Sequence, residues 1–238
     1  MKAMIFAAGL GKRLEKITEN IPKALVDING KTALHLAVEK CTDYGFNDII
    51  INVHHFADMV EDEASRLNKM GFRISVSDER EMLLETGGGL YKARGFFDKN
   101  PFLIYNVDII SDLDLSSLYS FHIKNNGLAT LAVRNRPGNR FYLVNESGLI
   151  RGWTNKLTGE KILVGAVSEK LTEIAFSSMH IVEPEIFDFM NEGIYTMTAQ
   201  YLKLAGEHNI YTFKHDEGFW ADIGTPENLE QVRKYFDN

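Results

Sequence analysis

Short apolar runs alternate along the first part of the chain with longer stretches whose apolar residues recur at helical spacing. The apolar runs predict buried strands at residues 2–8, 48–53, 72–77, 101–105 and 129–134. The longer stretches predict helices at residues 33–44, 56–70, 90–97 and 115–124. Alternating strands and helices are typical of a parallel sheet with helices on both faces. We therefore predict an α/β fold, a Rossmann-like three-layer sandwich around a mostly parallel central sheet.

The pattern changes after residue 135, where short apolar segments are separated by polar turns. These segments predict strands at residues 141–145, 149–153, 162–167 and 174–182. Residues 135–175 are therefore expected to form a small antiparallel insertion over the sheet instead of another crossover unit. The remaining segments predict helices at residues 184–190, 196–205 and 226–236 and an edge strand at residues 210–214. No linker or internal repeat divides the sequence, so we predict one domain spanning residues 1–238.

The first predicted strand runs into a loop that contains Gly9 and Gly11, and the cations Arg13 and Lys23 follow. Glycine lets the backbone approach a ligand closely and leaves amide N–H groups free to point at it. Arginine and lysine bind phosphate oxygens through charge-assisted hydrogen bonds. Together these residues predict a polyphosphate-binding loop. The alternative is a strand-to-helix turn with two solvated cations.

Two common phosphate-binding motifs do not fit this loop. The dinucleotide fingerprint requires a third glycine where Leu14 stands. The Walker loop requires serine or threonine after Gly-Lys, and Arg13 occupies that position. A dinucleotide-dependent dehydrogenase and a P-loop enzyme are therefore disfavoured.

Two later segments also point to a ligand. Gly87, Gly88 and Gly89 lie between a polar loop and a helical stretch, and we interpret them as a loop that lets a flat ligand approach its backbone. Asp108 follows the strand predicted at residues 101–105. Because ligands of open parallel sheets bind at the carboxyl ends of the strands, this aspartate is well placed to hold a divalent cation that bridges phosphates.

Composition excludes several classes of function. The net charge of the 238 residues is −7, which argues against a nucleic-acid binder and against a protein that binds anionic membranes. Cys41 stands alone, so the chain can form no internal disulfide, and this fits a reducing compartment. No stretch approaches the roughly 20 apolar residues of a membrane span, and the apolar run near the N-terminus is too short for a signal peptide. We expect a cytoplasmic location.

With these motifs in place, the chain resembles the sugar-1-phosphate nucleotidyltransferases, and most closely their N-acetylmuramate-1-phosphate uridylyltransferase branch. The Gly-x-Gly-x-Arg…Pro-Lys pattern of that family is intact. The resemblance extends over nearly the full length, with anchors at residues 7–13, 22–23, 84–89, 106–108 and 220–225. It implies one nucleotidyltransferase domain in which the insertion at 135–175 lies on the acceptor side.

The resemblance also implies a reaction and a site. An oxygen of a sugar 1-phosphate attacks the α-phosphorus of a nucleoside triphosphate, and pyrophosphate leaves. Catalytic roles fall on Arg13 and Lys23, and Mg²⁺ binding falls on Asp108 and Asp222. Asn106 is expected to contact the acceptor sugar. Nucleotide binding is expected from Ala8, Gly9, Gly11, Glu85, Thr86, Gly87 and Gly88.

Several substrates remain open at this stage. UTP with N-acetylmuramate 1-phosphate or a related hexosamine 1-phosphate is the leading hypothesis. A guanylyltransferase on mannose or heptose 1-phosphate and a cytidylyltransferase on a phosphorylated alcohol are the alternatives. A nucleotide-sugar sensor is disfavoured, because a sensor need not keep the four charged residues of the site.

The sequence departs from the family pattern on the acceptor side. Val107 and Ser178 replace glycines that the family usually has beside the sugar, so we expect altered discrimination between sugars. Muramate carries a carboxylate, and Arg136, Arg140 and Lys156 are the cations of the insertion that could recognise it.

Overall fold

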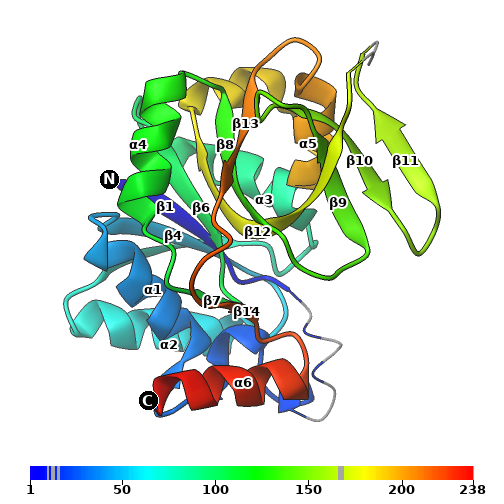
Figure 1. The fold of residues 1–238 in the computed structure, drawn as a ribbon. Coiled ribbons are helices and arrows are strands. Elements are labelled where there is room, and N and C mark those ends of the chain that lie inside the picture. Colours follow the sequence, from blue (N-terminus) through cyan, green and yellow to red (C-terminus); the bar gives the residue numbers. More distant parts are fainter. Residues whose placement is uncertain (10, 12–13, 15–16, 166–168, 238) are drawn as a thin grey trace.

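The computed structural model describes residues 1–9, 11, 14, 17–165 and 169–237. Parallel strands form one half of its central sheet (Figure 1). These strands follow the order β5-β4-β1-β6, where β1 is Lys2–Phe6, β4 is Asp48–Val53, β5 is Arg73–Asp78 and β6 is Phe102–Asn106. β1, β4 and β6 are apolar on both faces, as expected for strands that are covered on both sides. The parallel core predicted from the sequence is confirmed.

The long strand β12 (Thr172–Val182) joins this core to the antiparallel part of the fold. Its second half pairs with β6 and also with β8 (Ala129–Arg134), whose other neighbour is the edge strand β13 (Ile210–Lys214). Its first half pairs with a meander made of β9 (Arg140–Val144), β10 (Ile150–Asn155) and β11 (Glu160–Leu163). The meander is the antiparallel insertion expected after residue 135.

A bulge in β12 lies where the strand changes partners. The pairing register with β8 shifts between Phe176 and His180. Within this interval Ser178 has φ of 62°, in the left-handed region that glycine adopts most easily. Bulges bend a strand and increase its twist, and this one directs the first half of β12 toward the meander. Ser178 therefore adopts the conformation that suits the glycine implied at this position by the family resemblance.

Helices cover both faces of the sheet, which gives the three layers that the sequence predicts (Figure 1). Ala3 and Ile5 of β1 belong to a core that includes residues of α1 (Ala33–Asp43), α2 (Ala57–Lys69) and α4 (Leu115–Asn125). Met4 and Phe6 belong to a different core, which includes residues of α3 (Glu85–Lys92) and α5 (Met197–Leu204). Successive side chains of one strand therefore enter opposite layers.

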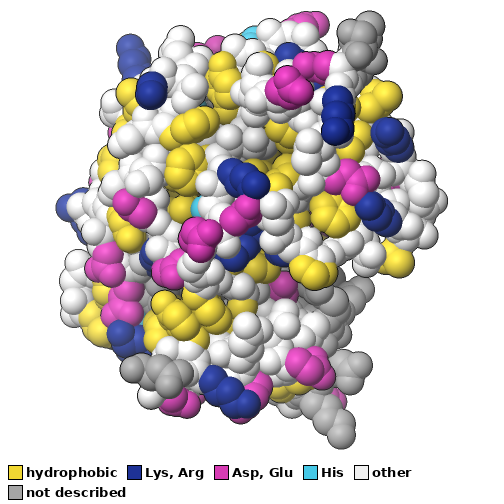
Figure 2. Space-filling model, in the orientation of Figure 1, with side chains coloured by type: hydrophobic (Ala, Val, Ile, Leu, Met, Phe, Trp, Pro, Cys, Tyr) yellow, Lys and Arg dark blue, Asp and Glu magenta, His cyan; other side chains and the backbone are white. Residues whose placement is uncertain are grey.

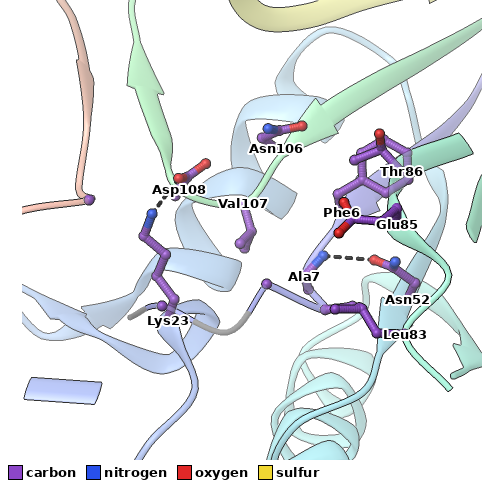
Figure 3. Close-up of a pocket in the computed structure, with 14 residues that line it drawn as sticks. Phe6, Ala7, Lys23, Asn52, Leu83, Glu85, Thr86, Asn106, Val107 and Asp108 are labelled. Carbon is purple, nitrogen blue, oxygen red and sulfur yellow. Dashed lines mark hydrogen bonds and ion pairs between the residues drawn. The ribbon is translucent and has the colours of Figure 1, made fainter. Parts of the chain in front are cut away.

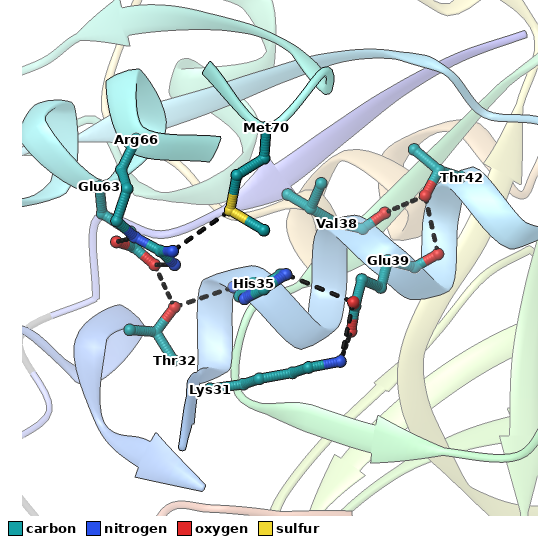
Figure 4. A network of polar contacts seen from close by, with 9 residues as sticks. All are labelled: Lys31, Thr32, His35, Val38, Glu39, Thr42, Glu63, Arg66 and Met70. Atoms are coloured by element: carbon teal, nitrogen blue, oxygen red, sulfur yellow. Dashed lines mark hydrogen bonds and ion pairs between the residues drawn. The ribbon is translucent and has the colours of Figure 1, made fainter. Parts of the chain in front are cut away.

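A polar network joins the start of α1 to α2 (Figure 4). The Thr32 side chain caps α1 by accepting from the His35 amide at 3.0 Å and donates its own hydroxyl to Glu63 at 2.6 Å. Arg66 binds the same carboxylate through Nε at 2.7 Å and Nη2 at 2.8 Å. Hydrogen bonding from Arg66 lowers the pKa of Glu63. The network fixes the two helices against each other on one face of the sheet.

A separate antiparallel pair was not predicted from the sequence. β7 (Ile109–Ser111) pairs with β14 (Trp220–Asp222) just beyond the end of β6. The closing helix α6 (Pro226–Phe236) packs against this pair, and Leu229 and Val232 share a small core with Ile110 and Ala221. Strands of three residues are too short to show a periodic pattern. This pair sets the C-terminal segment beside the end of the parallel core.

The glycine triplet departs from the prediction of a loop. Gly87, Gly88 and Gly89 lie inside α3, which starts five residues earlier than expected at Glu85. A Cβ on Gly88 would overlap the carbonyl oxygen of Gly193, and a Cβ on Gly87 would lie 2.8 Å from that of Tyr195. The glycines therefore let α3 pack directly on a neighbouring segment, and this packing offsets their low helix propensity.

We expect Gly88→Ala to lower the free energy of unfolding by about 1–3 kcal/mol, the usual cost of overpacking a well-packed contact. The added methyl group has no free space because its nearest neighbour is backbone. Gly95→Ala is the matched control, since a Cβ there meets nothing within 4 Å. Urea denaturation followed by circular dichroism measures both variants. Equal stability of the two would contradict the packing role.

The surface drawn in Figure 2 carries Lys and Arg side chains interspersed with Asp and Glu. Among the ion pairs of the surface, Lys214 and Asp216 lie 2.9 Å apart. A nucleic-acid-binding surface concentrates cations, whereas this face mixes the two signs. In the described part of the chain, no helix combines the length and the apolar character needed to cross a bilayer.

Candidate functional site

A pocket of about 460 Å³ opens at the carboxyl ends of β1 and β6, the edge where parallel sheets bind ligands (Figure 3). Eight of the residues that the sequence assigns to the site line it: Ala8, Gly9, Gly11, Lys23, Glu85, Thr86, Asn106 and Asp108. Further lining comes from Phe6, Ala7, Asn52, Leu83, Val107 and Gly224. Segments distant in the sequence thus converge on one cavity.

The other predicted residues are not among the described residues that line the pocket. Gly87 and Gly88 are buried in α3 against residues 193–195 and are not among the lining residues. Asp222 ends β14, beside the pocket and two residues before Gly224, which lines it. Arg13 is outside the described residues, so its role stays a prediction.

Lys23 and Asp108 form an ion pair at one end of the pocket (Figure 3). Lys23 begins the short 3₁₀ turn η2 (Lys23–Leu25) that follows Pro22, and Asp108 follows β6. The two side chains are 11% and 20% exposed, so the pair is only partly screened by water. In the free protein, the ammonium group therefore neutralises the carboxylate.

The pairing of β7 with β14 places a second carboxylate next to Asp108. The Ile223 amide donates to the Asp108 carbonyl at 2.9 Å, and Asp222 lies opposite Ile109 in the register. The side chain of Asp222 accepts from the Gly224 amide at 2.9 Å. Two aspartates far apart in sequence thus lie on adjacent backbone segments.

This donor set suits Mg²⁺ better than a metal held by protein alone. Among the described residues, no group of three His, Cys, Asp or Glu side chains converges. Mg²⁺ commonly uses one or two carboxylates and completes its shell with water and substrate phosphates. Asp108 and Asp222 match that requirement.

The opposite end of the pocket is formed by Phe6, Leu83, Glu85 and Thr86 (Figure 3). Glu85 has φ of 60°, an uncommon conformation for a residue with a side chain. Such strain persists where the surrounding structure enforces it, and it is frequent at functional sites. The Thr86 hydroxyl accepts from the Met197 amide at 2.8 Å, which anchors this wall to α5. An apolar wall with a carboxylate beside it suits a flat polar ring.

A buried network that the sequence analysis missed connects this wall to the glycine loop. Asn52 accepts from the Ala7 amide at 2.8 Å (Figure 3) and donates to Glu79 at 2.9 Å. Glu79 also accepts from the Leu84 amide at 3.2 Å. Asn52 and Glu79 are 3% and 1% exposed, and burial raises the pKa of Glu79. A polar residue within the apolar strand Asp-Ile-Ile-Ile-Asn-Val was the available signal.

We expect Asn52→Ala to lower the free energy of unfolding by about 1–3 kcal/mol, because the Ala7 amide loses its buried partner and the Glu79 carboxylate keeps only its bond from the Leu84 amide. The KM for nucleotide should rise as well, because the glycine loop loses its fixed position. Asn125→Ala is the control, since it removes a side-chain bond to Phe121 on α4, outside the pocket lining. Denaturation and steady-state kinetics test both effects. Unchanged nucleotide KM in Asn52→Ala would separate this network from the site.

Comparison with known proteins adds an independent line of evidence. The chain is 28% identical over 239 residues to N-acetylmuramate alpha-1-phosphate uridylyltransferase of Neisseria meningitidis serogroup B, covering 98% of this chain and 97% of that protein. It is 31% identical to the mannose-1-phosphate guanylyltransferase catalytic subunit beta of Xenopus tropicalis, over 96% of this chain and 62% of that protein.

Solved structures share the fold of this chain, and a family model matches its sequence. HddC from Yersinia pseudotuberculosis shares the fold, with a TM-score of 0.79 over 99% of both chains at 21% identity. The inositol-1-phosphate CTP transferase of T. maritima also has a TM-score of 0.79, at 16% identity over 99% of this chain and 94% of that one. The model of the family described as "Nucleotidyl transferase" matches residues 2–237. A match of this extent, together with the pocket at the sheet edge, shows that the chain belongs to the nucleotidyl transferase family.

Proposed function

We propose that this nucleotidyltransferase transfers a uridylyl group from UTP to N-acetylmuramate 1-phosphate or a related hexosamine 1-phosphate, releasing pyrophosphate. The observation that carries the proposal is the convergence of glycine-loop backbone, Lys23 and Asp108 on one pocket, with Asp222 beside it. The N-acetylmuramate alpha-1-phosphate uridylyltransferase relatives support the choice of substrate, because the chain spans 97% and 92% of their length.

The residues divide the reaction between them. Amides of the loop at Ala8, Gly9 and Gly11 bind the triphosphate, and Lys23 neutralises charge that develops on the α-phosphate. Glu85 and Thr86 frame the base, and Asn106 contacts the acceptor. Asp108 and Asp222 would hold Mg²⁺, which supplies positive charge to the phosphates when bound. Arg13 is assigned to the β- and γ-phosphates from the sequence pattern.

A guanylyltransferase acting on mannose 1-phosphate is the second candidate. The observation that favours it is the carboxylate of Glu85 in the pocket lining. A carboxylate accepts hydrogen bonds, and guanine offers adjacent ring N–H and amino donors, whereas uracil offers a single ring N–H on the corresponding edge. The guanylyltransferase relatives reach 31% identity, although the chain spans only 62% of their length.

An activity screen distinguishes the candidates. Each nucleoside triphosphate is combined with N-acetylmuramate, N-acetylglucosamine, mannose and heptose 1-phosphates, and pyrophosphate release is measured. We expect the highest kcat/KM with UTP and a hexosamine 1-phosphate. Preference for GTP with mannose or heptose 1-phosphate would move the assignment to the second candidate. Absence of turnover with every pair would favour a nucleotide-sugar sensor.

A further inference from the structure

Arg136, two residues after β8, is held by contacts with two other segments and lies outside the pocket lining. Its guanidinium lies 4.5 Å from the centre of the Trp220 ring, and its Nη2 donates to the Phe176 carbonyl at 3.0 Å. The Trp220 indole in turn donates to the Ser177 carbonyl at 3.1 Å. The loop after β8, the bulge of β12 and strand β14 therefore meet at this arginine.

Arg136 lies close to the second carboxylate of the site, because the Trp220 ring under its guanidinium is two residues from Asp222 on β14. Burial lowers the pKa of Arg136, and the nearby Asp222 opposes that shift by favouring the charged form. Arginine remains protonated at neutral pH, because its ordinary pKa lies far above 7. A held guanidinium thus stands beside an aspartate that we assign to metal binding.

Part of this guanidinium has no partner in the described structure. The Nε of Arg136 is buried and makes no hydrogen bond there. A buried donor without a partner costs free energy, and it is retained most readily where a ligand completes it. Arg134 also has a buried N–H without a partner and, like Arg136, donates through Nη2 to backbone carbonyls. Among the described contacts, it is Arg136 that also lies over the Trp220 ring of β14.

The other cations of the insertion are placed differently. Arg140 is exposed at the start of β9. Lys156 forms an ion pair with Glu173 at 2.5 Å. Among the three cations that the sequence offered for an anionic acceptor, Arg136 is thus the one held beside Asp222.

The acceptor needs such a cation. A sugar 1-phosphate would bring a phosphate group toward Asp108 and Asp222, and like charges that lie close together repel unless they are neutralised. Lys23 is the cation among the described lining residues, and Asp108 already engages it. A planar guanidinium can bind two phosphate oxygens at once, and the contacts to Trp220 and Phe176 fix its orientation in advance.

We propose that Arg136 binds the phosphate group of the acceptor sugar 1-phosphate, with Trp220 and the β12 bulge as its support. The inference rests on the proposed function, because it names the site of the acceptor in that reaction. It makes Arg136 a determinant of acceptor affinity that distinguishes phosphorylated from unphosphorylated sugars.

The test uses Arg136→Gln, Arg136→Lys and the control Arg73→Gln. Arg73 lies on β5, the strand at the far edge of the sheet, and its exposed side chain pairs with Asp48 of the neighbouring β4. The acceptor is the sugar 1-phosphate that the parent protein uses best. We expect Arg136→Gln to raise the KM for this acceptor by on the order of 10-fold or more, with nucleotide KM changed less than about twofold. Arg136→Lys should recover part of the loss, because it keeps the charge and loses the planar fork.

Calorimetric titration gives a readout that does not depend on turnover. The parent should bind the sugar 1-phosphate more tightly than the same sugar without phosphate, and Arg136→Gln should lose that difference. An unchanged KM for the acceptor, or equal rises in the KM for nucleotide and for acceptor, would overturn the assignment. Arg136 would then act only by neutralising Asp222. If Arg136→Gln is unfolded by circular dichroism, the same comparison is made with Arg136→Lys. A parent without activity on any sugar 1-phosphate would instead refute the proposed function.

Discussion

Replacing Asp108 by alanine should lower kcat by on the order of 10²-fold or more, the usual loss when one strong electrostatic contributor is removed. Asp108 lies at the end of β6, in the pocket lining, and its backbone is bonded to the segment that carries Asp222. Removing its carboxylate leaves Lys23 without its partner and halves the proposed metal-binding pair. The measurement is kcat with the best substrate pair across a range of Mg²⁺ concentrations.

Asp114, six residues after Asp108, provides the control. Asp114 caps α4 by accepting from the amides of Ser116 and Ser117, and its side chain is outside the pocket lining. Asp114→Asn can keep that cap, so its turnover should match that of the parent. Asp222→Ala should lower kcat about as much as Asp108→Ala does, because both carboxylates bind the same cation in the proposal. Near-normal turnover in either variant would remove that residue from the site.

Folding should survive the loss of Asp108. Its side chain is 20% exposed and lies at the ligand edge of the sheet, whereas the buried cores contain apolar residues on either face. The cost of leaving Lys23 without a partner is limited, since water can reach the end of the pocket. A circular dichroism spectrum like that of the parent would assign the lost turnover to chemistry.

Strong local signals explain what the sequence could predict. The strands predicted at residues 129–134 and 210–214 match β8 and β13 at both ends. The closing helix begins at Pro226 as expected, with Thr225 as its cap. Proline in the first helical turn and a threonine cap act within a few residues, so they can be identified without tertiary information.

The features that escaped prediction depend on contacts between distant segments. β7 and β14 are held by pairing with each other, more than 100 residues apart in sequence. Gly87 and Gly88 of α3 are required because the backbone of Tyr195 and Gly193 leaves no room for a side chain, and no local pattern reveals this contact. Asn52 and Glu79 also meet only after folding, and each alone resembles an ordinary polar residue. Tertiary packing decided the structure at these three places.

Lys23 should act mainly on the chemical step. In the free protein its ammonium is paired with Asp108, the residue that we assign to Mg²⁺ (Figure 3). In the proposed reaction Asp108 would hold Mg²⁺, so that Lys23 would no longer be needed to neutralise this carboxylate and could reach the α-phosphate. Its charge then matters most as that phosphorus becomes five-coordinate.

Lys23→Ala should therefore lower kcat by on the order of 10²-fold with a smaller change in nucleotide KM. Arg13→Ala is the comparison, since an arginine on the β- and γ-phosphates acts on groups already charged in the ground state and should mainly raise KM. Lys31→Ala is the structural control, because Lys31 pairs with Glu39 of α1 and neither residue lines the pocket. Identical effects of the Lys23 and Arg13 variants on kcat and KM would contradict this division of roles.

The pairing with Asp108 adds a second, opposite effect of the same substitution. Since the Lys23 ammonium competes with a cation for that carboxylate, its removal should tighten divalent-metal binding to the free protein even as turnover falls. Titration with Mn²⁺, followed by electron paramagnetic resonance, measures this affinity without nucleotide. A catalytic lysine remote from the metal ligands would leave the affinity unchanged, and one that helped to hold the metal site together would weaken it. Tighter Mn²⁺ binding combined with slower turnover is expected only if Lys23 neutralises Asp108 at rest and the α-phosphate during the reaction.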